Sequence, residues 1–115
     1  MDKMKMSETQ INELVEEIID YLKKYEFNED VNIYANGKKF SFDMNGEVVI
    51  KDNENPRDYF EYVATEHIVS MSFEGALYDL LNGYLGSTSD FDAIFEKRGL
   101  YYELGDSWNL SVYFI

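Results

Sequence analysis

The chain has 115 residues, of which 45% are apolar and 17% aromatic, and its formal net charge at neutral pH is −13. This length fits one domain with one core, and the aromatic content excludes the disordered class to which many short acidic chains belong. Cysteine is absent, which excludes disulfides and thiolate metal sites. No long apolar run follows the N-terminus, so we expect a cytoplasmic protein with neither signal peptide nor membrane span, and one domain over residues 1–115.

The N-terminal part of the chain predicts an amphipathic helix. Ser7 followed by Gln10 is a capping-box pattern, typical of a helix start. Apolar residues then recur at helical spacing, so we expect a helix from about residue 8 to 25. The recurring residues are Ile11, Leu14, Val15, Ile18 and Leu22. The acidic residues on or beside the solvent side are Glu13, Glu16, Glu17 and Asp20.

Three short strands are predicted next. Apolar residues alternate with polar ones from Val31 to Ala35, and Asn36-Gly37 then provides a hairpin turn. The alternation continues through residues 40–44, and a second pair, Asn45-Gly46, leads into residues 48–50. Asn-Gly is the strongest short-range hairpin signal, so these residues predict an antiparallel three-stranded meander.

The middle of the chain gives mixed signals. A polar run over residues 52–56 holds the only proline and predicts a loop. Residues 59–66 fit a helix turn as well as a strand, and their structure is left open. Alternation over residues 68–73 predicts a further strand.

Two short helices and a second hairpin are predicted to follow. Residues 75–82 have the pattern of a short helix ended by Gly83, and Ser89 is expected to cap another, with Lys97 and Arg98 in its last turn and Gly99 after it. The C-terminal residues 100–115 alternate around a turn at residues 105–107, and the apolar last strand is expected inside the sheet. The fold class is therefore α+β: an antiparallel sheet of about five to six strands with helices on one face.

Few residues suggest chemistry. His67 follows Glu66, which is the pair that a general base would need. Neighbouring side chains diverge on a strand or helix, so we expect a surface or turn histidine instead. Asp90 and Asp92 could bind Mg²⁺ or Ca²⁺, but no EF-hand spacing accompanies them and compensation of a helix dipole is the favoured interpretation. We expect no catalytic, cofactor-binding or metal-binding residue, and no enzyme.

The negative charge is unevenly distributed. Residues 8–30 hold eight acids against two lysines, and residues 52–106 hold twelve acids against three cations. Residues 31–51, the predicted meander, hold two acids against three lysines and are nearly neutral. A surface of this sign repels nucleic acid and anionic membranes and attracts basic proteins quickly. The simplest alternative is that the charge serves solubility alone.

Two stretches, residues 70–82 (SMSFEGALYDLLN) and residues 99–110 (GLYYELGDSWNL), look like parts of small uncharacterised proteins of phages and mobile elements in low-GC bacteria. In size, lack of cysteine and charge the chain is also similar to anti-CRISPR and antirestriction proteins, several of which are DNA mimics. This similarity is one of general character and transfers no functional residue. It implies a stoichiometric inhibitor, monomer or dimer, whose acidic face enters the basic channel of a CRISPR effector or restriction nuclease and excludes DNA.

The partner-binding residues expected on this hypothesis are all acidic. They are Glu13, Glu16, Glu17, Asp20, Asp58, Glu61, Asp79, Asp90, Asp92 and Glu96. The alternative is a non-enzymatic adaptor of a phage or mobile element, which binds a basic protein or dimerises through an edge strand and whose acidic surface serves only solubility. Weak salt dependence and no competition with DNA would distinguish the adaptor from the mimic.

Overall fold

The helix predicted at the N-terminus is present. The computed structural model describes residues 6–55 and 68–115. Helix α1 (Glu8–Lys24) begins at the expected capping box, in which Gln10 N donates to Ser7 Oγ at 3.1 Å and Ser7 N donates to Gln10 Oε1 at 2.8 Å. Its buried residues are Leu14, Val15, Ile18 and Leu22, all four from the predicted apolar series. Lys23 and Lys24 lie in the last turn, where they offset the helix dipole.

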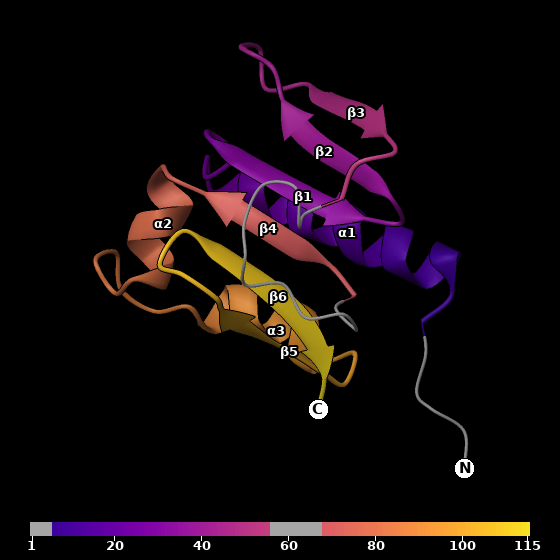
Figure 1. Ribbon diagram of the computed structural model, residues 1–115. Helices are drawn as coiled ribbons and strands as arrows, with labels where there is room; N and C mark the ends of the chain where they lie inside the picture. Colours follow the sequence, from indigo (N-terminus) through magenta and orange to yellow (C-terminus); the bar gives the residue numbers. More distant parts are fainter. Residues whose placement is uncertain (1–5, 56–67) are drawn as a thin grey trace.

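Six strands form one antiparallel sheet (Figure 1). The strands are β1 (Val31–Ala35), β2 (Lys38–Phe42), β3 (Val48–Asp52), β4 (Ser70–Phe73), β5 (Leu100–Leu104) and β6 (Asn109–Phe114), in the spatial order β3-β2-β1-β4-β6-β5. The predicted meander and C-terminal hairpin are therefore confirmed, and so is the α+β fold class. The last strand lies inside the sheet, between β4 and β5, as its apolar pattern predicts.

The two Asn-Gly pairs form different turns. Asn36 and Gly37 have φ values of 52° and 73°, which is the left-handed pair that a two-residue hairpin needs. At the second pair only Gly46 has a positive φ, 78°. Asp43 closes this longer turn, because its carboxylate accepts the N–H groups of Asn45 at 2.8 Å and Glu47 at 3.0 Å. The position of both turns was predictable, but the conformation of the second was not.

The short helices α2 (Ala76–Leu81) and α3 (Ser89–Glu96) follow β4, as predicted. The expectation that Ser89 caps α3 is wrong in detail: Thr88 is the N-cap residue, and it makes no side-chain capping bond. Helix α3 also ends before the two cations that were expected in its last turn. Lys97 is the C-cap residue, and Arg98 follows it and donates from Nη1 to the carbonyl of Ile94 at 2.8 Å.

The core lies between the sheet and the helices. Helices α1 and α3 cover the same face of the sheet, α1 behind β1 and α3 behind β5 and β6 (Figure 1). Alternate residues of each strand point into this layer, as a pleated strand requires. The fully buried strand residues there include Ile33, Met71, Phe73, Leu110 and Val112, which meet Leu14, Ile18, Phe91 and Phe95 of the helices.

Several sequence-based interpretations lie outside the described residues. The open helix-or-strand question for residues 59–66 is one of them, and the role of His67 is another. The proposed contact residues Asp58 and Glu61 also fall there. The question of residues 59–66 stays open, and the interpretations of His67, Asp58 and Glu61 stay predictions.

Candidate functional site

Helices α1 and α3 contact each other on one face of the sheet (Figure 1), and both carry exposed acids. Along α1, Glu13, Glu16 and Asp20 lie opposite the buried apolar side and are exposed. Glu96 is exposed on α3. None of these four carboxylates forms an ion pair with any part of the chain that the structure describes. We use the name helix face for these four carboxylates together with the exposed Asp90 of α3: Glu13, Glu16, Asp20, Asp90 and Glu96.

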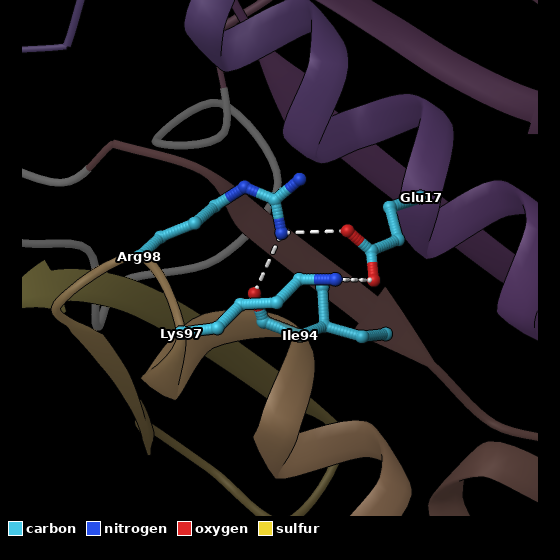
Figure 2. A network of polar contacts seen from close by, with 4 residues as sticks. All are labelled: Glu17, Ile94, Lys97 and Arg98. Carbon is cyan, nitrogen blue, oxygen red and sulfur yellow. Dashed lines mark hydrogen bonds and ion pairs between the residues drawn. The ribbon is translucent and has the colours of Figure 1, made fainter.

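Glu17 differs from its acidic neighbours because it bridges the two helices (Figure 2). Lys97 Nζ lies 2.5 Å from Glu17 Oε2, and Arg98 Nη1 lies 2.7 Å from Glu17 Oε1. Partial burial alone would raise the pKa of Glu17, but the bonds and charges of the two cations outweigh this effect and lower the pKa below its ordinary value of 4.5. The charge of Glu17 is therefore compensated within the protein, and this carboxylate links α1 to the end of α3.

A groove of about 330 Å³ separates the outer parts of α1 and α3. Asp20 of α1 and Asp90 of α3 line it, together with the rings of Tyr21 and Tyr25 and the side chain of Lys24. The Tyr25 hydroxyl donates to Asp90 Oδ2 at 3.0 Å. Desolvation, together with the neighbouring hydroxyl and carboxylates, raises the pKa of Tyr21 to about 12, so this side chain remains a neutral phenol at neutral pH. The groove thus combines aromatic surface with carboxylates.

Asp92 does not line this groove, and both of its carboxylate oxygens accept hydrogen bonds from other side chains of the protein. Its Oδ1 accepts the Tyr102 hydroxyl at 2.5 Å, and its Oδ2 accepts the Thr88 hydroxyl at 2.8 Å. Desolvation and the bond to Asp92 raise the pKa of Tyr102 well above its ordinary value. Asp92 is half-buried, and its bonds hold the start of α3 to strand β5. Its role in the structure is to position these elements.

The structure thus brings together only part of the predicted set of contact residues. Five of the ten form the helix face, while Glu17 and Asp92 have partners inside the protein. Asp79 lies on α2, which is not part of the α1–α3 pair. Which acids share a face, and which are already neutralised, depends on contacts between residues far apart in the sequence.

A second acidic groove was missed at the sequence level. The loop after α1 and the turn between β2 and β3 form a groove of about 600 Å³ that is lined by carboxylates. Met44, at the turn, is fully exposed. Its acidic residues are Glu26, Glu29, Asp30 and Asp43. The signal available in the sequence was the acidic run over residues 26–30. The proximity of the β2–β3 turn to that run is a tertiary property.

Within the described ranges, 6–55 and 68–115, no group of three or more His, Cys, Asp or Glu side chains is arranged to hold a metal ion. No helix in these ranges is both long and apolar enough to cross a bilayer. Comparison with protein-family models, curated proteins and solved structures finds no match to this chain. Its function must therefore be inferred from its own residues and their arrangement.

Proposed function

We propose that this protein is a stoichiometric, non-enzymatic inhibitor that docks its helix face on the basic DNA-binding surface of a nucleic-acid enzyme, such as a CRISPR effector or a restriction nuclease. The observation that carries the proposal is the set of four carboxylates on α1 and α3 that have no ion pair among the described residues. An acidic surface held on a folded body can occupy a channel shaped for phosphates and exclude DNA from it.

The spacing of the charges supports this mode of binding. An α-helix rises about 1.5 Å per residue, so Glu13, Glu16 and Asp20 follow one another at about 4.5 and 6 Å along the axis of α1. One strand of B-DNA has a phosphate for about every 3.4 Å of the helix axis. The charge density of this side of α1 is therefore lower than that of a DNA strand but of the same order.

The Glu17 bridge gives the helix face a fixed geometry. It joins α1 to the residues that end α3, so the carboxylates of the two helices are held in one relative position. A rigid arrangement loses little conformational entropy on binding, which favours affinity. The aromatic rings in the groove add apolar contact area beside the charges, as tyrosine does at many protein interfaces.

The proposal is tested by reversing the charge of the helix face. In the first variant Glu13, Glu16, Asp20 and Glu96 are all changed to lysine. In the control variant four exposed acids away from α1 and α3 are changed to lysine, namely Glu29, Glu47, Glu74 and Glu103. Both variants change the net charge by the same amount, so they separate the position of the charge from its total.

The partner is first captured from nuclease-treated lysate at low salt, identified by mass spectrometry and purified. We expect the partner to be a DNA-binding enzyme that duplex DNA displaces from the protein. The wild type and the control variant should bind and inhibit this enzyme, whereas the helix-face variant should do neither. The association rate should also fall steeply as salt increases, because the attraction is electrostatic. Equal loss in both variants, or a partner indifferent to DNA, would reject docking through the helix face and favour the adaptor hypothesis.

A further inference from the structure

Strand β3 leaves one edge of the sheet unpaired among the described residues. It contains Val48, Val49 and Ile50, and Ile50 is 55% exposed. Natural edge strands are usually protected by charged side chains, proline or a bulge, because free N–H and C=O groups recruit another strand. The charged residues of β3, Lys51 and Asp52, stand at its end. The sequence of β3 contains no proline, and its central residues are β-branched and apolar.

The helices leave the same end of the sheet partly uncovered. A groove of about 280 Å³ runs between α1 and the two outer strands. Its apolar lining comes from Val15 and Ile19 of α1 and from Phe40, Val48 and Ile50 of the strands. The free strand edge and this apolar groove lie next to each other, so one occupant that pairs with β3 would also cover the groove.

The alternation of backbone hydrogen bonds along β3 favours pairing with another strand centred on Ile50. Asp43 N donates to Glu47 O at 2.9 Å at the start of the β2–β3 ladder. Antiparallel ladders alternate bonded and non-bonded pairs, so Val49 and Lys51 bond toward β2 and Ile50 directs its N–H and C=O outward. Two copies of β3 related by a twofold axis at Ile50 would exchange both of these bonds. Val49 would then face Lys51 of the second copy, and no like charges would stand directly opposite each other.

Charge also favours a second copy at this edge. The chain carries −13 in total, but residues 31–52, which contain β1, β2 and β3, hold three lysines against three acids and are neutral. Two copies therefore repel each other least when they meet through the meander. At the opposite edge, β5 contains Glu103, and Asp92 and Glu96 of α3 line the surface next to it. Two copies that met through β5 would bring these carboxylates together.

We propose that the protein forms a twofold dimer through antiparallel pairing of β3 with β3 of a second copy, which joins the two sheets and covers the apolar groove beside Ile50. The dimer is isologous, as most homodimers are. Of the helix-face acids, Glu16 lines the groove that the dimer covers, beside Lys38, whereas Glu13, Asp20, Asp90 and Glu96 do not line it. The dimer does not depend on the proposed inhibition.

The test compares two single substitutions on opposite edges of the sheet. Ile50→Lys places like charges opposite each other across the twofold axis, whereas Leu104→Lys adds the same charge to the edge strand β5, where Leu104 is 39% exposed. Molecular mass is measured by light scattering and sedimentation over a wide concentration series at low and moderate salt. Thermal unfolding of both variants checks that they are folded.

We expect the wild type and Leu104→Lys to double in mass as concentration rises, more readily at moderate salt because screening weakens the repulsion between copies. Ile50→Lys should stay monomeric over the same series. Hydrogen exchange of the wild type gives a second readout, in which the Ile50 amide becomes protected as dimer forms. A wild type that stays monomeric throughout, an unprotected Ile50 amide in the dimer, or a dimer lost in Leu104→Lys but kept in Ile50→Lys would each overturn the proposal.

Discussion

The Glu17 bridge makes a quantitative prediction about stability. Replacing Glu17 with glutamine keeps the size and polarity of the side chain but removes its charge, so the bonds to Lys97 and Arg98 lose their ionic part. The Glu17 side chain is 31% exposed, that of Arg98 24% and that of Lys97 56%. Solvent-exposed ion pairs contribute about 0.2–1 kcal/mol each to the free energy of unfolding. Of the two pairs, the one with Arg98 is less exposed than the one with Lys97. We therefore expect Glu17→Gln to lower the free energy of unfolding by about 1 kcal/mol, or roughly 4 °C in melting temperature.

The pH dependence of this loss of stability identifies its cause. The pKa of Glu17 is lower in the folded protein than its ordinary value of 4.5, so the folded state binds fewer protons at this group than the unfolded state does. The stability from the bridge is therefore fully present above pH 4.5 and disappears as pH falls through the lowered pKa. The difference between wild type and Glu17→Gln should be constant at neutral and mildly acidic pH and should shrink toward zero in acid.

Chemical denaturation at a series of pH values measures this difference. Glu16→Gln is the matched control, because Glu16 is the neighbouring residue on α1, is exposed and forms no ion pair with the described residues. It should change stability by less than about 0.5 kcal/mol, as surface substitutions usually do. Equal losses in the two variants, or a loss in Glu17→Gln that persists unchanged in acid, would refute the bridge as a source of stability.

Two further substitutions test the packing. Phe91 is fully buried, and its ring centroid lies 5.3 Å from that of Tyr21 and 5.2 Å from that of Tyr102, so Phe91→Ala should cost about 3–5 kcal/mol in denaturant unfolding. A cost near that of a surface change would mean that this aromatic cluster does not hold α3 in place. A Cβ at Gly75 would lie 2.8 Å from the backbone oxygen of Glu29, so Gly75→Ala should destabilise the protein by about 1–3 kcal/mol through this clash. An unchanged melting temperature would show that the loop holding Glu29 yields at little cost.

Local patterns in the sequence predicted the helices and strands of the described residues. The capping box at Ser7 and the apolar series that follows it specify α1 without reference to the rest of the chain, because helix caps and helix faces involve residues three or four apart. Asn36-Gly37 specifies the first hairpin for a similar reason, since two adjacent residues supply the left-handed turn. The residue that caps α3 was placed one position too late, because Ser89 and Thr88 are both capping residue types.

The order of the strands depends on tertiary structure. Pairing of β1 with β4 joins residues about 40 positions apart, Val31 with Phe73 and Ile33 with Met71. Many apolar strands could satisfy the same periodicity, so alternation alone does not choose the neighbour. The position of β6 inside the sheet was the exception, because a strand so apolar requires cover on both sides.

The sequence by itself determined the size of the negative charge, its concentration outside the meander and the elements on which it lies. Only the tertiary structure decided which acids are available to a partner. Glu16 and Glu17 are adjacent on α1, yet Glu17 is neutralised by cations that follow α3, 80 residues away, while Glu16 has no such contact. The physical reason is that the attraction between two charges weakens as the distance between them grows. The distances between Glu17 and the two cations are set by how α1 and α3 pack on the sheet.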